Sequence, residues 1–405
     1  MSLHIIDEAN RCLNCKKPMC QQGCPIHTPI PKVIQMFKEH KMTEAGEMLF
    51  TNNPLSVVCS IVCNHEMQCE GHCVLGKKGN PIHFRSIENY ISDGYLDRME
   101  IKKKEKNGKC AAVIGAGPAG ITVAVELIRN GYDVTIFEEQ DEIGGVMRYG
   151  IPEFRLPKTI IKRYEKKLLE MGIQIRPKTI IGSALEIKDL FRDGYQAVFI
   201  GTGVGKPKTL GIKGESLSNV HFGINYLANP DAYHLGENVA VIGMGNVAMD
   251  VARTALRHGA RHVTLYARGK RISASSSEMF FAELDGAEFA FGKAICAIEK
   301  EGPIFQTTIF DENDKVIGYE EELDAVKADS TIIAVSQGPQ NKLILTTEGL
   351  MGSEKGFLIV DENGMTTCEG VFAAGDVVHG AKTVVHAVEE AKKTAAAMMK
   401  YMERK

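Results

Sequence analysis

The sequence lacks long apolar runs and any strong excess of one charge, and both absences restrict its function. Its 48 basic and 51 acidic residues give a formal net charge of −3. This balance argues against a nucleic-acid partner, which would favour a strongly basic face. No apolar run is long enough to span a bilayer, and the opening residues MSLHIIDEANR lack the parts of a signal peptide. We therefore expect a soluble, cytoplasmic protein.

Cysteine is scarce over most of the chain and concentrated at one end. Eight of the eleven cysteines lie in the first 73 residues, whereas Cys110, Cys296 and Cys368 are scattered. Because no export signal is present, this clustering indicates ligation of a metal or a cluster rather than disulfide bonds.

The cysteines form two groups, spaced Cys12-x2-Cys15-x4-Cys20-x3-Cys24-Pro25 and Cys59-x3-Cys63-x5-Cys69-x3-Cys73. Apolar residues at roughly helical spacing separate the groups, which predicts a small helical domain built around inorganic centres. The spacings match the paired knuckles of zinc sites poorly, and a compact quartet that ends in Cys-Pro is typical of bacterial ferredoxins. We predict two [4Fe–4S] clusters, with structural zinc and free thiols as alternatives.

A βαβ dinucleotide-binding pattern follows the cysteine-rich segment. A buried strand ends at Ile114, the glycine pattern Gly115-x-Gly117-x-x-Gly120 comes next, and a helix leads to a second strand that ends in Glu138. In such units the glycines admit a pyrophosphate, the helix N-terminus stabilises its charge and the acid binds ribose hydroxyls. The alternative is a glycine-rich turn in an ordinary α/β sheet.

A second glycine pattern, G-x-G-x-x-A, covers residues 243–248 between another strand and another helix. The strand that follows the helix leads to Arg268 instead of an acid. An acid there would suit the free ribose of NAD, whereas Arg268, Lys270 and Arg271 could pair with the 2′-phosphate of NADP. We favour NADP(H), with NAD(H) and a solvated basic turn as alternatives.

A strand near the C-terminus ends in Gly375-Asp376 and precedes a helix over 383–400. Asp376 suits a cofactor hydroxyl, although an N-cap would look the same. The two glycine patterns and this strand end imply an α/β fold in which one of two Rossmann-like domains is inserted in the other. We expect a helical domain over 1–105, a first dinucleotide-binding domain over 106–222 and 336–405, and a second, NAD(P)H-binding domain over 223–335.

Several phrases are informative together, namely Cys12-Leu13-x-Cys15, Cys24-Pro25, Asn53-Pro54-Leu55, Gly144-Gly145, Gly150-Ile151-Pro152-x-Phe154-Arg155-Leu156-Pro157, Val247-Ala248-Met249-Asp250 and Ala374-Gly375-Asp376. With these phrases the chain resembles the flavoproteins that have two dinucleotide-binding domains. The cysteine-rich domain narrows the resemblance to the glutamate synthase small subunit and to the N-terminal half of dihydropyrimidine dehydrogenase, including its separate bacterial flavoprotein subunit. The resemblance covers nearly the whole chain.

The resemblance implies that FAD binds at the first glycine pattern and a nicotinamide nucleotide at the second. The residues expected to bind FAD are Gly115, Gly117, Pro118, Ala119, Gly120, Glu138, Gly144, Gly145, Arg155, Gly203, Gly375, Asp376 and Thr383. Those expected to bind the nicotinamide nucleotide are Gly243, Gly245, Asn246, Val247, Ala248, Arg268, Lys270 and Arg271.

The resemblance also implies two ligand sets. One cluster would be held by Cys12, Cys15, Cys20 and Glu88, and the other by Cys24, Cys63, Cys69 and Cys73. Cys59 would lie nearby without acting as a ligand. In an all-cysteine alternative, Cys59 takes the place of Glu88.

These features together predict an electron-transfer flavoprotein. NAD(P)H would give a hydride to the flavin, and single electrons would pass through the clusters to a partner, or in reverse, with no catalytic acid or base. We expect a partner of the glutamate synthase large-subunit type, with a dihydropyrimidine-reducing or a bifurcating flavoprotein partner as alternatives. Other classes are a disulfide or peroxide reductase with structural zinc, which the isolated Cys110 disfavours, and a non-catalytic nucleotide sensor.

Overall fold

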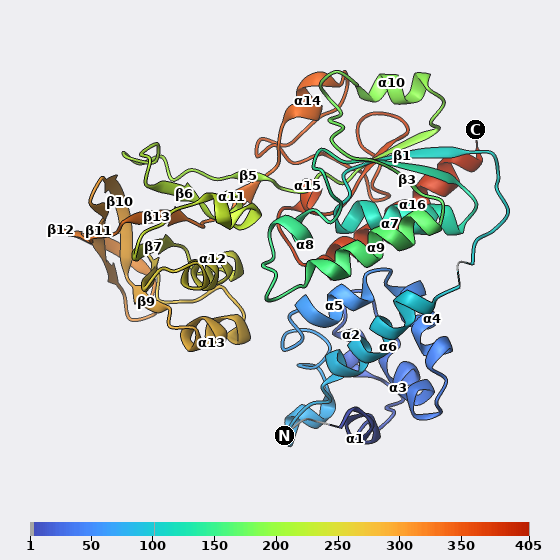
Figure 1. Cartoon of the computed structure of the whole chain (residues 1–405), viewed down its shortest axis with the longest axis horizontal. Coiled ribbons are helices and arrows are strands. Elements are labelled where there is room, and N and C mark those ends of the chain that lie inside the picture. Colours follow the sequence, from blue (N-terminus) through green and yellow to red (C-terminus); the bar gives the residue numbers. More distant parts are fainter. Residues whose placement is uncertain (1–3, 101, 405) are drawn as a thin grey trace. The chain divides into compact units, whose positions relative to one another are not determined.

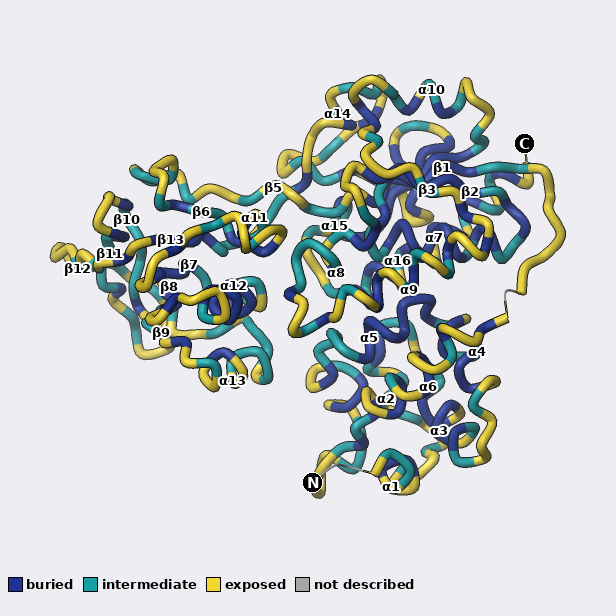
Figure 2. The backbone as a smooth tube through the Cα atoms, in the orientation of Figure 1, coloured by how far each residue is buried: buried dark blue, intermediate teal, exposed yellow. Residues whose placement is uncertain are grey.

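The computed structural model describes residues 4–100 and 102–404, which form two compact units. The first unit contains Met1–Met147, Glu153–Val204 and Pro339–Lys405, and the second contains Arg148–Pro152 and Gly205–Gly338 (Figure 1). Within the described ranges, no helix combines the length and the apolar character needed to cross a bilayer. In both units the central strands of the main sheet are largely buried, whereas edge strands are more exposed (Figure 2).

The first unit begins with short helices that pack around an apolar centre. The helices are α1 (Ile5–Asn10), α2 (Met19–Gln22), α3 (Ile30–Lys38), α4 (Met42–Asn52), α5 (Ser56–Val62) and α6 (Phe84–Arg98), with a 3₁₀ turn at Val74–Lys77. Apolar side chains at helical spacing, such as Val33, Ile34 and Phe37 of α3, face this centre. The thiols of Cys24 and Cys69 are part of the same core.

A five-stranded parallel sheet forms the rest of the first unit, in the order β15-β4-β1-β2-β3. Its strands are β1 (Cys110–Ile114), β2 (Asp133–Phe137), β3 (Gln174–Arg176), β4 (Ala197–Ile200) and β15 (Val371–Ala373). The helices of this part are α7 (Pro118–Arg129), α8 (Val146–Tyr149, shared with the second unit), α9 (Lys158–Glu170), α10 (Ile187–Arg192), α14 (Lys342–Thr346), α15 (Asp376–His379) and α16 (Val384–Glu403). The strand order reverses at β1, which places the glycine turn after β1 at a switch point where ligands bind in such sheets.

The second unit has its own five-stranded parallel sheet, in the order β6-β13-β7-β8-β9. Its strands are β6 (Val220–Phe222), β7 (Asn238–Ile242), β8 (His262–Ala267), β9 (Glu288–Phe291) and β13 (Ser330–Ile333). An antiparallel sheet adds β10 (Lys293–Glu299), β11 (Gly302–Phe310) and β12 (Val316–Ala325), and a short pair joins β5 (Lys206–Pro207) to β14 (Gln337–Gly338). The helices are α11 (Gly223–Ala228), η2 (Pro230–Ala232), α12 (Asn246–Arg257) and α13 (Ser276–Leu284).

This architecture confirms the expected fold class, a helical domain followed by two Rossmann-like domains. The second unit begins at Gly205, earlier than the expected boundary at residue 223. The earlier residues belong to this unit because β5 pairs with β14 and Lys213 pairs with Ala297. β6, a strand of three residues, then pairs with β13 at the edge of the second sheet. Three residues are too short a run for hydrophobic periodicity to reveal.

Two basic side chains attach the helical domain to the flavin-type fold within the first unit. Lys392 of α16 donates from Nζ to the backbone oxygens of Thr51 and Asn52 at 2.7 and 2.8 Å, which satisfies carbonyls at the C-terminal end of α4. Arg163 of α9 donates from Nε to Oδ1 of Asp97 on α6 at 2.8 Å. The helical domain is therefore held to the sheet domain through the carbonyls at a helix end and through an ion pair between side chains.

Candidate cofactor sites

The glycines of the first turn have two different roles: the protein's own packing requires two of them, and the third leaves open space beside the turn. A Cβ on Gly120 would lie 1.9 Å from the Gly115 carbonyl oxygen, and a Cβ on Gly115, where φ is +98°, would lie 2.7 Å from the Gly201 carbonyl oxygen. Gly117 has no such conflict, since the nearest atom to its added Cβ is the Gly201 oxygen at 3.9 Å. The missing side chain of Gly117 therefore opens room at the turn instead of allowing protein packing.

The open space lies at the N-terminus of a twelve-residue helix, α7. Pro118 is its first residue, Gly117 is the N-cap with extended backbone, and no side chain caps the helix. The unpaired N–H groups of such a first turn suit the negative charge of a pyrophosphate. Gly144 donates from its N–H to the Ala116 oxygen at 2.9 Å, so the predicted Gly144-Gly145 loop also lies at this turn.

Glu138 occupies the expected place after β2. Its carboxylate accepts hydrogen bonds from the backbone N–H of Ala116 at 2.6 Å and of Gln140 at 2.8 Å. Burial raises the pKa of Glu138, and these two N–H groups partly oppose that rise. The backbone thus fixes the carboxylate beside the glycine turn, where the hydroxyls of a ribose would lie in this type of fold.

The Gly375-Asp376 strand end, far away in the sequence, lies against the same turn. An added Cβ on Gly375, where φ is +79°, would be 3.2 Å from the Cβ of Ala119 in α7. Oδ1 of Asp376 accepts from the Lys382 N–H at 3.1 Å. Burial raises the pKa of Asp376 to about 6, Glu390 adds to the rise, and the Lys382 N–H and ammonium oppose it.

The remaining residues expected to bind FAD lie in loops or at the start of a helix. Gly203, where φ is +67°, lies in the loop after β4 with open space around an added Cβ. Thr383 is the N-cap of α16, and its hydroxyl lies 2.6 Å from Nδ1 of His386. Arg155 is half-buried in the segment before α9. Gly201, whose carbonyl lies against the glycine turn, is not among the residues expected from the sequence. The Gly-x-Gly pattern that follows β4 could have indicated it.

The second glycine turn repeats these features in the second unit. An added Cβ on Gly243 would lie 2.4 Å from the Ala334 oxygen, whereas at Gly245 the nearest atom would be Oγ of Ser273 at 3.6 Å. The side-chain oxygen of Asn246, at the start of α12, accepts from the Ser275 N–H at 2.9 Å. The loop after β8 therefore lies next to this turn, and Gly245, like Gly117, leaves room for a ligand.

The three basic residues expected near this turn have different environments. Lys270 forms an ion pair with Asp314, with 2.6 Å between Nζ and Oδ1, and lies 4.7 Å from the centre of the Phe310 ring. Arg268 and Arg271 are exposed, and no ion pair of either is recorded in the described part of the chain. The two arginines are thus more available to an anion than Lys270 is.

One set of thiols surrounds an apolar cavity in the helical domain. Cys12, Cys15, Cys20 and Cys73 line it, and Cys69 reaches it from the neighbouring set. The other walls are apolar side chains, including Leu13, Met19, Ile34, Leu75 and Phe84. Burial raises the pKa of Cys20 to about 11, and Cys73, Cys12 and Cys15 are the thiols close enough to raise it further.

A second set gathers around Glu88 on the buried face of α6. Cys24, Cys63 and Cys69 each have Glu88 close enough to raise the thiol pKa, and Cys59 also raises the pKa of Cys63. Burial raises the pKa of Glu88 well above its ordinary value, Cys59 and Glu70 add to the rise, and no hydrogen bond from a described residue offsets it. Buried thiols around an uncompensated carboxyl are a donor set that suits a metal centre.

The fourth member of each set differs from the expected one. The structure places Cys73 with Cys12, Cys15 and Cys20, and Glu88 with the other cysteines, so the two residues are exchanged. Cys73 directly precedes the 3₁₀ turn that lines the first cavity, whereas Glu88 lies on the buried face of α6. No three His, Cys, Asp or Glu side chains in residues 4–100 and 102–404 are close enough to hold a single metal ion.

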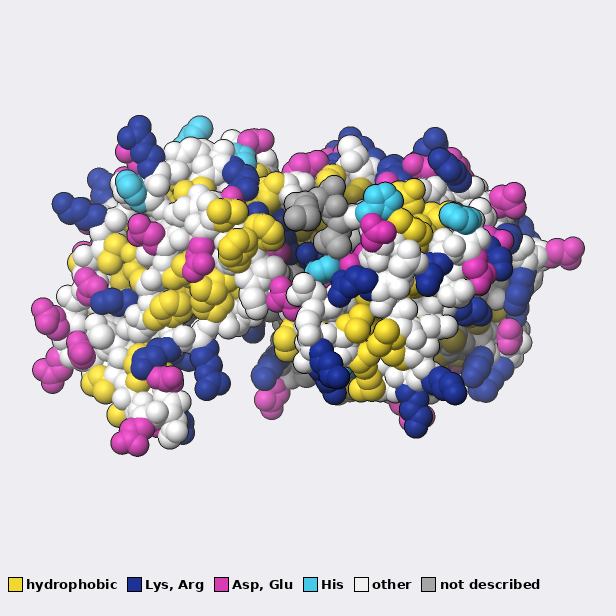
Figure 3. Space-filling model, turned by 90° about the horizontal axis from the view of Figure 1, so that it is seen from below, with side chains coloured by type: hydrophobic (Ala, Val, Ile, Leu, Met, Phe, Trp, Pro, Cys, Tyr) yellow, Lys and Arg dark blue, Asp and Glu magenta, His cyan; other side chains and the backbone are white. Residues whose placement is uncertain are grey.

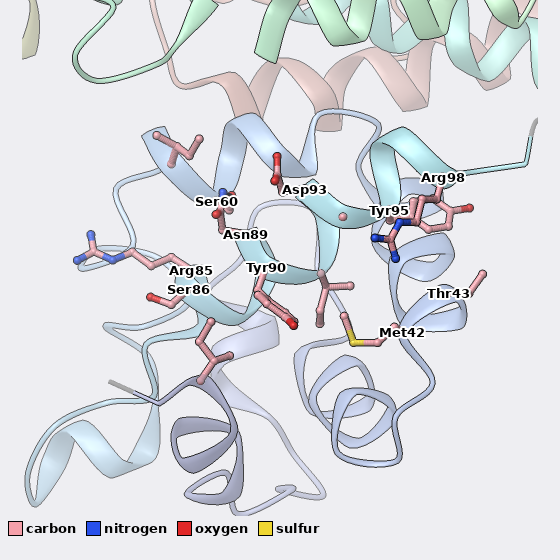
Figure 4. A pocket seen from close by; sticks show the side chains of 14 residues that line it. Met42, Thr43, Ser60, Arg85, Ser86, Asn89, Tyr90, Asp93, Tyr95 and Arg98 are labelled. Carbon is pink, nitrogen blue, oxygen red and sulfur yellow. Dashed lines mark hydrogen bonds between the residues drawn. The ribbon is translucent and has the colours of Figure 1, made fainter. Parts of the chain in front are cut away.

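A larger open pocket of about 800 Å³ lies along the other face of α6 (Figure 4). Arg85, Asn89 and Arg98 line it, and Asn89 donates to Oγ of Ser60 at 3.0 Å. None of the expected site residues lines this pocket. The helix therefore presents its polar face to this pocket and its buried face to the thiols.

Two family matches separate the helical domain from the two nucleotide-type folds. Residues 109–391 match the pyridine nucleotide-disulphide oxidoreductase family, and residues 2–100 match the family described as dihydropyrimidine dehydrogenase domain II, 4Fe-4S cluster. The chain thus consists of a 4Fe–4S domain followed by FAD- and NAD(P)H-binding domains.

Relatives that match nearly the full length agree with this division. The glutamate synthase [NADPH] small chain of Halomonas elongata is 34% identical over 429 residues, covering 98% of this chain and 90% of the relative. The NAD-dependent dihydropyrimidine dehydrogenase subunit PreT of Salmonella typhimurium is 32% identical over 411 residues, covering 99% and 95%. The structure of Mycobacterium tuberculosis FprA in complex with NADPH shares the fold, with a TM-score of 0.61 and 17% identity over 73% of this chain and 85% of that chain.

Substitution of two glycines tests whether the open space beside Gly117 is occupied by FAD. Gly117→Ala should cost the apo-protein no more than about 1 kcal/mol, because its Cβ meets open space, yet it should abolish FAD retention. Gly120→Ala should destabilise the fold by about 3 kcal/mol or more, because its Cβ meets the Gly115 carbonyl. Thermal unfolding of apo-protein and flavin content on purification measure the two effects. Normal FAD content in Gly117→Ala would contradict the assignment.

Asp376 provides a test that depends on pH. Its folded-state pKa of about 6 exceeds the ordinary 3.8, so the folded protein binds an extra proton between these values and loses stability as the pH rises through them. At pH 8 the Asp376→Asn apo-protein should therefore be more stable than wild type by up to about 3 kcal/mol, and the difference should vanish below about pH 4. Urea unfolding across pH measures this. Identical pH profiles of the two proteins would show that Asp376 is not held as described.

Proposed function

The chain belongs to the family of iron–sulfur flavoproteins that contains the glutamate synthase small chain and PreT, and from this premise we propose its particular role. Members of this kind are NAD(P)H-dependent flavin oxidoreductases, and so is this chain. The proposed role is to oxidise NADPH and to supply single electrons to a large subunit of the glutamate synthase type. Two [4Fe–4S] clusters in the helical domain would carry those electrons.

The observation that carries this proposal is that the helical domain packs on the first nucleotide-type fold within one compact unit, with the second thiol set near the contact. Tyr164 of α9 is buried, and Cys59 and Glu88 are close enough to affect the pKa of its hydroxyl. The adjacent Arg163 pairs with Asp97 of α6. The second thiol set thus lies on the side of the helical domain that meets the sheet domain, which supports a relay from the flavin through the second set to the first.

The chain's own residues would bind and orient the cofactors. When bound, a flavin takes up an electron pair as hydride and iron–sulfur clusters pass electrons singly. Gly117 and the first turn of α7 would hold the pyrophosphate of FAD, while Glu138 and Asp376 would hold its hydroxyls. Cys12, Cys15, Cys20 and Cys73 would hold one cluster, and Cys24, Cys63, Cys69 and Glu88 the other, with Cys59 as the remaining alternative to Glu88.

PreT provides the second candidate function, a subunit that serves a dihydropyrimidine dehydrogenase. Its alignment covers 95% of the relative's length, against 90% for the glutamate synthase small chain. The length of the chain thus favours PreT, while the identity slightly favours the synthase subunit. Co-purification of the chain with each type of catalytic subunit, followed by turnover driven by NADPH and separately by NADH, would distinguish the two functions.

Arg268 should determine the preference for NADPH. Arg268→Ala removes a charge-assisted contact with the 2′-phosphate, which is worth about 1.5–3 kcal/mol, so the KM for NADPH should rise about 10- to 100-fold. The KM for NADH should stay within a factor of about two. Lys270→Ala is the matched control, because Lys270 is engaged with Asp314 and should have a small effect. Equal losses with both nucleotides in dye-reduction assays would refute the assignment.

The ligand sets can be tested by combining substitutions. Cys73→Ser and Glu88→Ala should each reduce the iron of anaerobically purified protein from about eight to about four atoms per chain. Cys12→Ser with Cys73→Ser should lose no more iron than either alone, because both residues serve one cluster. Cys73→Ser with Glu88→Ala should lose nearly all of it, and Cys59→Ser should lose none. Additivity between Cys12 and Cys73 would show that they belong to different clusters.

A further inference from the structure

Two large apolar side chains are exposed beside the first thiol set. Leu13, between Cys12 and Cys15, is 62% exposed, and Met19, next to Cys20, is 42% exposed. Both side chains also line the apolar cavity that the thiols surround. They therefore connect the interior of that site with the protein surface.

The chain segments that build this surface contain no acidic residue. Residues 9–38 and 71–87 lack Asp and Glu entirely, in a chain whose formal net charge is −3. Together they carry Arg11, Lys16, Lys17, Lys32, Lys38, Lys77, Lys78 and Arg85. Positive charge is thus concentrated here against the trend of the whole protein.

The two acid-free segments lie together in space. Cys73 joins the cysteines of the first segment, and Arg11 donates from NH2 to the Asn80 backbone oxygen at 2.5 Å. Arg11 is also paired with the buried Glu8, so its charge is offset. The lysine charges at positions 16, 17, 77 and 78 are not offset in this way, since all four are exposed and form no ion pair with a described residue.

The surface thus combines apolar side chains with unpaired positive charge. We call the surface formed by Leu13, Met19, Lys16, Lys17, Lys77 and Lys78 the basic face. Leu13 and Met19 line one cavity with Val74 and Leu75, which closely precede Lys77 and Lys78 in the chain. Figure 3 shows one face of the molecule, on which apolar side chains reach the surface among charged side chains of both signs. An apolar centre with a charged rim is typical of protein interfaces, whereas scattered lysines alone would be a solvated surface.

We propose that the basic face is the docking site for an acidic protein that carries a one-electron acceptor. The inference rests on the proposed function, because the first thiol set must hold an electron-transfer centre. Positive charge would steer an acidic partner to the face, and Leu13 and Met19 would exclude water at the contact. Each encounter transfers one electron from this chain to the oxidised centre of the partner, with no bond formed or broken and no proton moved.

Charge reversal on the intact, anaerobically purified protein tests the proposal. The probe is an oxidised, acidic [2Fe–2S] ferredoxin. The measured quantity is the rate at which the protein reduces it when NADPH supplies the electrons. Lys16→Glu with Lys17→Glu, and separately Lys77→Glu with Lys78→Glu, should each slow its reduction about tenfold or more at low ionic strength. Added salt should slow the wild type and remove most of the difference.

The matched control reverses two exposed lysines on α16, Lys393→Glu with Lys400→Glu, which carry the same change in net charge. This control should reduce ferredoxin at the wild-type rate. Leu13→Ser should weaken ferredoxin reduction at all salt concentrations, because its contribution is apolar. The lysine variants should all keep wild-type iron content and wild-type reduction of a small neutral dye.

The outcomes separate this inference from the proposed function. A protein without iron would remove the proposed function itself. A protein with normal iron whose ferredoxin reduction ignores the charge reversals would overturn only the docking site. Co-sedimentation of the wild type with phosphatidylglycerol vesicles, lost in the reversed variants, would assign the basic face to lipid and would also overturn it.

Discussion

A carboxyl group and several thiols buried together in a small helical domain are the constraint on which this structure depends. Glu88 is 6% exposed, and no hydrogen bond among the described residues stabilises its charge. Cys24 and Cys69 belong to the core that the short helices share. Polar groups buried in this way are costly unless a partner compensates them, and bound metal is the partner that thiols and carboxylate share. The helical domain therefore has a reason to need bound iron–sulfur centres for its stability.

Glycine has a similar double role in both nucleotide folds. Gly115, Gly120 and Gly243 are required by the protein's own backbone, whereas Gly117 and Gly245 leave space that no side chain fills. The same short pattern therefore specifies the contact of helix with strand and the place of the ligand. This division explains why a single sequence pattern predicts both the fold and the site.

Local patterns made most of the fold predictable. Strand, glycine turn and helix follow one another within about thirty residues in each βαβ unit, so the sequence revealed both sheets and the place of Glu138. The thiol set to which Cys73 and Glu88 each belong was not predictable. It depends on how α6 and the 3₁₀ turn pack, which the spacing of cysteines does not encode. β6 was missed because three residues carry no usable periodicity. Gly201 and Glu390 reach the candidate FAD site only through tertiary contact.

Anomalous scattering at the iron absorption edge from crystals of the anaerobically purified protein tests the central claim most directly. The account predicts two separate iron centres in the helical domain. One should be bound by Cys12, Cys15, Cys20 and Cys73, and the other by Cys24, Cys63, Cys69 and Glu88. A single centre, a zinc-edge signal in its place, or Cys73 and Glu88 bound to each other's centre would contradict it.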